Sequence, residues 1–483
     1  MKKSKVVIFI LALTVLFVIF GEKLFPGTPI ESMELGSGIP LFFCIPFVGM
    51  LLSIAVLPML AANMWEKWRG VISLFWALLF AVPFAIVYGM PTMLEQLSES
   101  IIGDYLTFIV LLFGLFCVSG NICLEGDLAG TPRTNVIMLA IGTVLASWIG
   151  TTGASMLMIR PLLRVNSWRS RTIQTVVFFI FLVSNIGGAL SPIGDPPLLM
   201  GFIRGVPFTW ELQHMSLITL LNVVLLLGIY YVIDKRAYNK DIAVGLVPAS
   251  DGTKLRLVGA HNIIFLVMIV GAVILSGVLP SLPLFQNAEG GVLGIHIYGE
   301  VELGWPTIIE VALILLAALL SFITTKEKVR RDNNFSWGAI EEVAVLFIGI
   351  FITMIPALLF LKAHGAEMGL TEPWQMFWVT GGLSSFLDNT PTYLVFLTTA
   401  GALGATAGVQ TTVGIIGTKM LMAISCGAVF MGANTYIGNA PNFMVKSIAE
   451  ESGVRMPSFF HYMLWSLRFL VPIFIIDMLI FFL

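Results

Sequence analysis

Residues 191–197 read Ser-Pro-Ile-Gly-Asp-Pro-Pro, and residues 435–441 read Thr-Tyr-Ile-Gly-Asn-Ala-Pro. The isoleucine, the glycine and the last proline are identical, while serine is matched by threonine and aspartate by asparagine. Both stretches interrupt apolar regions. Glycine and proline break a helix there and free backbone groups, which hydrocarbon tolerates only where protein or a water-filled cavity satisfies them. The two stretches therefore predict two interrupted helices at corresponding places in a repeated sequence.

A second, weaker pair of similar stretches lies upstream of each break. Residues 147–152, Ser-Trp-Ile-Gly-Thr-Thr, can be aligned with residues 385–390, Ser-Phe-Leu-Asp-Asn-Thr, with two identities. The order of the two motifs is the same in both halves of the chain. Paired breaks in a repeated sequence are typical of the substrate site of a secondary transporter. The alternative is a pair of proline-kinked helices without a ligand.

The composition places the repeat in a membrane. Of the 483 residues, 58% are hydrophobic and only 11% are charged, against about 25% charged in soluble domains. Long apolar runs cover residues 5–20, 39–61, 71–90, 105–120, 172–190, 213–233, 259–279, 305–324, 339–361, 412–431 and 462–483. These lengths are close to the roughly 20 residues that cross a bilayer as a helix. The first run has no convincing cleavage site after it, so we expect a retained helix.

Two further apolar regions, 135–163 and 374–407, are each divided by turn-forming residues into arms too short to cross. We predict re-entrant hairpins. If the first hairpin enters and leaves the membrane on the same side, the arginines of residues 160–171 lie on the side that carries most of the Lys and Arg residues. The positive-inside rule makes that side, with the N-terminus, cytoplasmic. The second hairpin then opens to the outside, so the two halves have opposite orientations.

The predicted fold is an all-α integral membrane protein with about eleven transmembrane helices, two re-entrant hairpins and two interrupted helices, arranged as two inverted repeats. The expected parts are first-half scaffold helices (1–120), a first-half transport unit (121–212, with hairpin 135–163 and broken helix 172–203), second-half scaffold helices (213–361), a second-half transport unit (362–456, with hairpin 374–407 and broken helix 412–450) and a C-terminal helix (457–483). We expect a multi-pass protein of the cell (inner) membrane.

The broken regions contain two carboxylates, Asp195 and Asp388. An aspartate at the centre of a membrane helix costs about 2.5–3.5 kcal/mol on insertion scales, so both are candidate functional groups. A carboxylate can hold a proton or Na⁺, and competition between them is the simplest chemistry of a cation/proton antiporter. The alternatives are a helix N-cap for Asp195 and a turn residue for Asp388.

Uncharged oxygen donors in the same turns could complete a cation site or only stabilise the turns. They are Thr151, Thr152, Asn389, Thr390, Asn434 and Asn439, with Asn185, Ser191, Gly194, Gly438 and Lys419 in supporting positions. Lys419 could pair with a carboxylate, replace a departing cation, or extend toward the membrane interface. A polar residue before proline predicts new half-helices after Asp195, Asn439 and Thr390, and such N-termini could also face an anion.

Three regions of the chain resemble the signature of NhaD-type sodium/proton antiporters. They are residues 184–197, 386–392 and 432–442. These antiporters belong to the ion transporter superfamily, which also contains citrate and dicarboxylate symporters. The resemblance implies a homodimer whose mobile transport domains move like elevators against a scaffold. It also implies that the tip at Thr151 faces the break at Asp195, and that residues 388–390 face the break at residues 434–439.

The symporters typically carry Ser-Asn-Thr at both hairpin tips, whereas this chain has Gly-Thr-Thr at residues 150–152 and Asp-Asn-Thr at residues 388–390. That difference favours exchange of Na⁺, with Li⁺ as a further candidate, for H⁺. Na⁺-coupled uptake of citrate or a dicarboxylate is the alternative, and a channel or sensor is a third class. We expect no enzymatic activity, no cofactor, no transition metal, and no nucleotide or nucleic acid partner. The expected partners are the transported cations, the lipid bilayer and a second copy of the chain.

Overall fold

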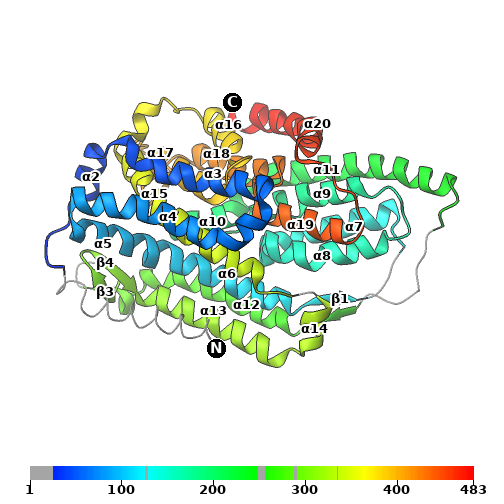
Figure 1. Ribbon diagram of the computed structural model, residues 1–483, viewed down its shortest axis with the longest axis horizontal. Coiled ribbons are helices and arrows are strands. Elements are labelled where there is room, and N and C mark those ends of the chain that lie inside the picture. The colour runs from blue at the N-terminus through cyan, green and yellow to red at the C-terminus, as the bar shows by residue number, and fades with distance from the viewer. Residues whose placement is uncertain (1–24, 126–128, 248–255, 288–290, 334) are drawn as a thin grey trace. The chain divides into compact units, whose positions relative to one another are not determined.

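The computed structural model describes residues 25–125, 129–247, 256–287, 291–333 and 335–483 (Figure 1). The predicted first span, 5–20, lies outside these residues. The described chain is mostly helical, and ten of its helices are long and apolar enough to cross a membrane. Its strands form only short two-stranded ribbons. The predicted class, an all-α integral membrane protein, is confirmed.

The described helices are α2 (Ser32–Gly38), α3 (Ile45–Leu60), α4 (Ala62–Tyr88), α5 (Met90–Ser98), α6 (Leu106–Gly120), α7 (Pro132–Ile149), α8 (Thr151–Val165), α9 (Ile173–Leu182), α10 (Pro196–Ile203), α11 (Trp210–Ala243), α12 (Asn262–Val278), α13 (Trp305–Thr324), α14 (Glu327–Asp332), α15 (Gly338–His364), α16 (Pro373–Ser384), α17 (Asn389–Gly401), α18 (Thr418–Met431), α19 (Ala440–Glu451) and α20 (Phe459–Asp477). Most of the long helices overlap the predicted apolar runs, whereas α2, α5 and α14 lie between them.

Three antiparallel ribbons connect some of these helices. They pair β1 (Cys123–Glu125) with β2 (Arg256–Val258), β3 (Gly294–Tyr298) with β4 (Val301–Gly304), and β5 (Val409–Thr411) with β6 (Gly414–Ile416). The last ribbon corrects one predicted boundary. The second broken helix was expected from residue 412, but it begins at Thr418 because the preceding residues pair as strands.

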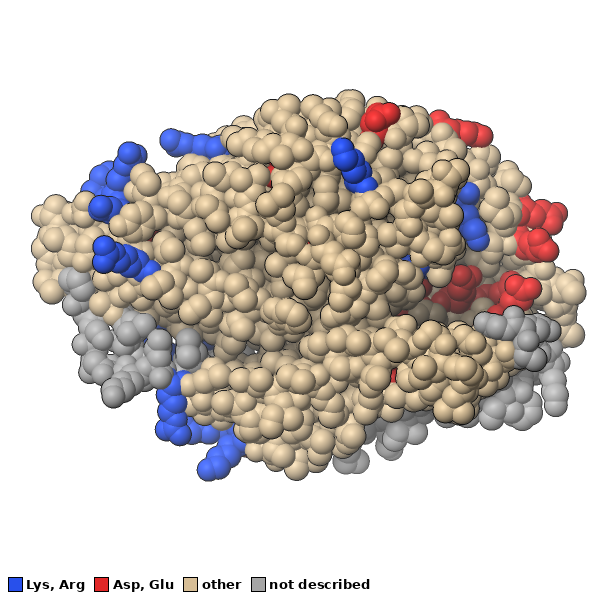
Figure 2. Space-filling model, turned by 180° about the vertical axis from the view of Figure 1, so that it is seen from behind, with Lys and Arg blue, Asp and Glu red and all other residues tan. Residues whose placement is uncertain are grey.

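The described residues form two compact units. Unit 1 comprises the chain up to Val110 together with Ala272–Ala312 and Glu341–Ala363, and unit 2 comprises Leu111–Gly271, Leu313–Ile340 and His364–Leu483. Much of the surface seen in Figure 2 carries no charged side chain, as expected of helices that face lipid. Both predicted hairpins and both predicted broken helices lie in unit 2.

Unit 1 is built on an aromatic and aliphatic core. Phe43, Phe80 and Phe84 pack with residues of α15 such as Ile355 and Leu359. The rings of Phe43 and Phe84 meet edge to face, with centroids 5.8 Å apart. This packing joins α4 and the 3-10 turn Leu41–Cys44, which precedes α3, to α15, which is far away in sequence.

In unit 2, α7 and α8 form the first hairpin. Gly150 is the only residue between them, and its φ of 78° is a left-handed conformation that glycine adopts without strain. At the other end, Asn135 and Asn166 donate hydrogen bonds to each other at 2.9 and 2.8 Å. The start of α7 therefore lies beside the end of α8, so the chain enters and leaves the hairpin on the same side.

The two hairpins open toward opposite ends of unit 2. Between Ile173 and Arg204 the chain runs through α9, the first break and α10. The base of the first hairpin adjoins the start of α9. At the far end of α10, the backbone N–H of Thr412, which follows the second hairpin, donates to the carbonyl of Arg204 at 2.8 Å. This arrangement agrees with the inverted orientation expected from the sequence.

The same hydrogen bonds recur in both halves, at positions that the sequence alignment pairs. Each hairpin tip contributes a serine whose hydroxyl donates to the broken helix of its own half and whose carbonyl accepts from the break. The hydroxyl of Ser147 donates to the carbonyl of Gly187, and the hydroxyl of Ser385 donates to the carbonyl of Met431. In return, the hydroxyl of Ser191 donates to the carbonyl of Ser147, and the hydroxyl of Thr435 donates to the carbonyl of Ser385. The repeat that the sequence shows is therefore also present in the structure.

Candidate functional site

The carboxylate of Asp195 lies at the centre of the predicted site. Asp195 is the residue before α10, and its backbone is extended, with φ of −143° and ψ of 141°. Its side chain makes no capping hydrogen bond to that helix, and the residue is only 1% exposed. Asp195 thus occupies the N-cap position of α10, but its side chain does not cap the helix, since its carboxylate oxygens point elsewhere.

Three uncharged side chains from three different elements donate to that carboxylate. Thr151 Oγ1, at the tip of the first hairpin, lies 2.8 Å from Oδ1. Asn439 Nδ2, at the second break, lies 3.1 Å from the same oxygen, and Asn389 Nδ2, at the tip of the second hairpin, lies 2.6 Å from Oδ2. Both hairpin tips and both breaks thus meet at one carboxylate.

The first tip is also held to the first break by its backbone. The N–H of Thr151 donates to the carbonyl of Gly194 at 2.8 Å. The tip at Thr151 therefore faces the break at Asp195, as the resemblance implies. The second tip reaches across to the first break through Asn389, in addition to its own break, where Asn434 Nδ2 donates to Ser385 Oγ at 2.9 Å.

Asp388 has a different role from Asp195. Its Oδ1 accepts from the backbone N–H of Thr390 at 3.1 Å, so Asp388 caps α17. The predicted half-helix start after Thr390 is wrong by two residues, because Asp388 takes the capping position and α17 begins at Asn389. The half-helices after Asp195 and Asn439 begin where the prolines predicted. Asp388 still lies close enough to Asp195 for their negative charges to interact.

Amide side chains connect the two breaks behind the carboxylate. Asn439 Nδ2 also lies 3.3 Å from Asn185 Oδ1, and Asn185 Nδ2 donates to Asn442 Oδ1 at 2.7 Å. Asn442 Nδ2 in turn donates to the backbone carbonyls of Gly432 and Thr435. This chain of amides fixes the position of one break relative to the other.

Two buried oxygens beside this network have no hydrogen-bond partner among the described residues. They are Oγ1 of Thr390 and Oδ1 of Asn434. Both atoms carry lone pairs, which are the groups that a hard cation prefers as ligands. An unsatisfied buried oxygen is costly, so both atoms are suited to a bound cation or water.

The remaining predicted residues lie around the cluster or outside it. Gly194 and Gly438 allow close backbone contact within the two breaks, and Ser191 donates to Ser147. Thr152 is half-buried next to Thr151 and makes none of the described side-chain hydrogen bonds. Lys419 is exposed in the first turn of α18, about 18 Å along that helix from its end. None of the described contacts of the two aspartates involves Lys419.

The described residues contain no group of three or more His, Cys, Asp and Glu side chains that could hold a metal ion. The site is instead one of carboxylate, amide and hydroxyl groups. Such a set suits a proton or an alkali cation better than a transition metal, which prefers nitrogen and sulfur ligands.

Comparison with known families supports a transport function for this arrangement. Residues 36–482 match the family model described as "Putative citrate transport". The chain belongs to this family. It is therefore a multi-pass membrane protein of a secondary transporter family. A search of curated proteins found no significant relative.

Two residues that hold the site together were not among the site residues predicted from the sequence. Asn442 bridges the breaks, and Ser385 receives the side chain of Asn434. Sequence features that could have pointed to them are present: Asn442 follows the last proline of the second break, and Ser385 aligns with Ser147. Neither signal distinguishes a network residue from an ordinary polar residue, because the partners lie far away along the chain.

Proposed function

We propose that the protein is a secondary active cation transporter that exchanges Na⁺, or Li⁺, for H⁺ across the cell membrane. The observation that carries the proposal is the setting of Asp195. Its buried carboxylate accepts from Thr151, Asn389 and Asn439, and none of its described hydrogen bonds or ion pairs comes from a basic side chain.

A buried carboxylate without a basic partner requires another source of positive charge. Neutral donors stabilise the anion, but they do not cancel its charge, and the charge of Asp388 acts against it. A proton or an alkali cation would neutralise the site. Since only one of them is needed at a time, the two would compete, which is the basis of exchange.

The proposed cycle uses the chain's own groups. In one state Asp195 carries a proton. In the other, Asp195 and nearby oxygens such as those of Thr390 and Asn434 hold the cation, while the hairpin tips enclose it from both sides. We propose that a transport domain carries this site across the membrane like an elevator, in a homodimer with cytoplasmic N-termini. These last features rest on the resemblance to the superfamily.

The family description favours a second candidate, Na⁺-coupled uptake of citrate or a related carboxylate. In that case the N-termini of α10 and α19 would face the substrate carboxylates, and a co-bound cation would offset the charge of Asp195. The two candidates differ in whether ion movement requires an organic anion.

Reconstituted vesicles distinguish the two candidates. With a preset pH gradient and a trapped pH-sensitive dye, added NaCl or LiCl should move protons without any organic anion, and choline chloride should not. Proton movement that requires citrate or succinate, together with uptake of labelled citrate, would show that the protein is a symporter and overturn the exchange proposal.

Variants then test the central residue. Asp195→Asn should abolish exchange, because the amide can neither release a proton nor balance a cation. Asp477→Asn is the matched control: Asp477 is fully buried in α20, where Asn222 donates to it, and it is absent from the contacts of Asp195. Full exchange in Asp195→Asn, or equal loss in both variants, would contradict the assigned role.

A further inference from the structure

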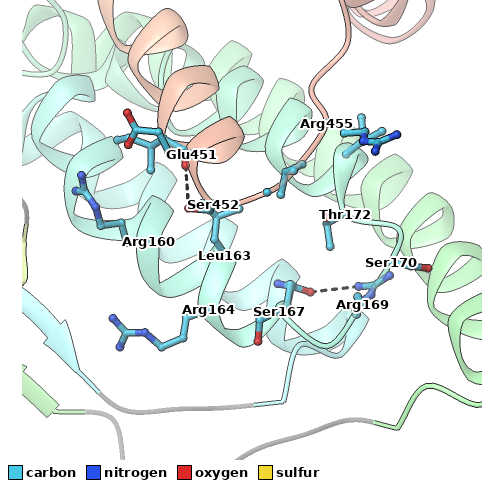
Figure 3. Close-up of a pocket in the computed structure, with 15 residues that line it drawn as sticks. Arg160, Leu163, Arg164, Ser167, Arg169, Ser170, Thr172, Glu451, Ser452 and Arg455 are labelled. Carbon is cyan, nitrogen blue, oxygen red and sulfur yellow. Dashed lines mark hydrogen bonds between the residues drawn. The ribbon is translucent and has the colours of Figure 1, made fainter.

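A pocket of about 860 Å³ lies in unit 2, between the base of the first hairpin and the end of α19 (Figure 3). It is lined by the last turns of α8, the loop that leads into α9, and residues 448–455. The residues of the Asp195 cluster are not part of its lining. The pocket is therefore a second site, at the end of unit 2 toward which the first hairpin opens.

The lining is basic. It contains Arg160, Arg164, Arg169 and Arg455 but only one acidic residue, Glu451. Figure 3 shows Arg160 and Arg164 on one side of the pocket and Arg455 on the other. Glu451 is exposed and forms no ion pair with these arginines in the described structure.

One of the four arginines, Arg169, is already paired with two aspartates that do not line the pocket. Arg169 Nη2 lies 2.8 Å from Asp234 Oδ1, and Arg169 Nε lies 3.4 Å from Asp241 Oδ2, with all three side chains buried. Burial alone would lower the pKa of Arg169, but the hydrogen bonds that Arg169 donates to Asp234, and the negative charge of Asp234, raise it above its ordinary value. Arg169 therefore holds the loop in place, and three arginines remain for a ligand.

Arg160 shows that the pocket needs an acceptor. Its Nη1 atom is shielded from solvent and has no hydrogen-bond partner among the residues described. A buried, charged donor without an acceptor is costly, and the cost is relieved by an oxyanion. Guanidinium groups match phosphate and carboxylate oxygens in geometry as well as charge.

The same walls also carry apolar side chains. Leu163, Ile173, Ile448 and Val454 line the pocket together with the arginines. A ligand with an anionic group and an apolar body fits this mixture better than a small hydrophilic ion does. Basic pockets between membrane helices, near the ends of those helices, are suited to the headgroups of anionic phospholipids.

We infer that this pocket binds the phosphate headgroup of an anionic phospholipid, with Arg160 and Arg455 as its main contacts. The lipid would join α8 of the first half to the segment after α19 of the second half. The inference does not depend on which ion the protein transports.

The test uses the full chain in nanodiscs of phosphatidylcholine mixed with phosphatidylglycerol or cardiolipin. After extraction into mild detergent, native mass spectrometry measures the lipid retained. Each arginine near an anionic headgroup contributes about 1 kcal/mol, or about fivefold. The wild type should therefore retain the anionic lipid, and the double variant R160Q/R455Q should bind it about 25-fold more weakly. Arg236→Gln, at an exposed arginine of α11 outside the pocket, should bind it normally.

Other outcomes would overturn the inference. Equal retention by the wild type and R160Q/R455Q would show that the pocket is not the lipid site. Displacement of the lipid by millimolar inorganic phosphate or citrate would assign the pocket to a soluble anion instead. The single variant Arg160→Gln removes a half-buried charged group whose buried Nη1 atom has no acceptor, so its melting temperature in pure phosphatidylcholine should not fall. A clear fall there would show that Arg160 is structural.

Discussion

Two aspartates of similar appearance in the sequence have different surroundings in the structure. Asp195 is fully buried, does not cap its helix, and receives side chains from both hairpins. Asp388 is half-buried and uses one oxygen to cap α17. The two were predicted to share the work of holding cation and proton. We now propose Asp195 as the principal group, with Asp388 acting mainly through its charge and by positioning Asn389.

The hydroxyl of Thr151 provides a test at this scale. Thr151→Val keeps the shape of the side chain but removes the donor to Asp195, whereas Thr151→Ser keeps the donor. A hydrogen bond to a charged group contributes about 1.5–3 kcal/mol, so the half-saturating Na⁺ concentration should rise about 10- to 100-fold in Thr151→Val. Thr151→Ser should stay near the wild type. Vesicle exchange assays over a range of Na⁺ concentrations measure this, and similar values for the two variants would contradict it.

At the scale of elements, each break depends on two glycines that touch. A Cβ atom on Gly194 would collide with the backbone of Gly188, and one on Gly438 would collide with the backbone of Gly432. These are corresponding positions in the two halves. The glycines are thus required for close packing of backbone against backbone, which brings the tip and the break together.

Replacement of these glycines should therefore destabilise the protein. Gly194→Ala and Gly438→Ala should each lower the free energy of unfolding by about 1–3 kcal/mol, because packed backbone must shift. Gly228→Ala, in α11 where nothing lies within 4 Å of the new Cβ, should instead add about 0.5–1 kcal/mol. Thermal unfolding in detergent measures all three. A break variant as stable as Gly228→Ala would show that the backbone contact is dispensable.

At the scale of the whole molecule, stretches far apart in sequence gather at one end of unit 2. The loop at Arg169 binds the end of α11 through Asp234, and α8 packs against α19. Ribbon β1–β2 joins residues 123–125 to residues 256–258 at the ends of other predicted spans. Of these stretches, residues 160–171 were predicted to be cytoplasmic from their arginines. The contacts of the other stretches with α8 and with the loop at Arg169 support one common side for all of them.

Cysteine labelling tests that topology. In a variant without Cys44, Cys117, Cys123 and Cys426, a membrane-impermeant maleimide should label Thr406→Cys on intact cells. Ser167→Cys should react only after the cells are permeabilised. Both positions are exposed. Thr406 follows α17 at the open end of the second hairpin, and Ser167 follows α8 at the open end of the first. Labelling of both from the same side would contradict the inverted hairpins, and the reverse pattern would place the N-terminus outside.

The sequence by itself determined the membrane class, the two breaks and the two hairpins, and it singled out Asp195 as a candidate site residue. These features depend on composition, apolar length, and glycine and proline at particular positions, which are local properties of the chain. The tertiary structure alone decided that Asn389 reaches Asp195 from 194 residues away, that Asn442 bridges the breaks, and that Asp388 caps a helix. The physical reason is that a hydrogen bond depends on the distance and direction between two atoms. For residues so distant along the chain, only the packing of the helices determines those quantities.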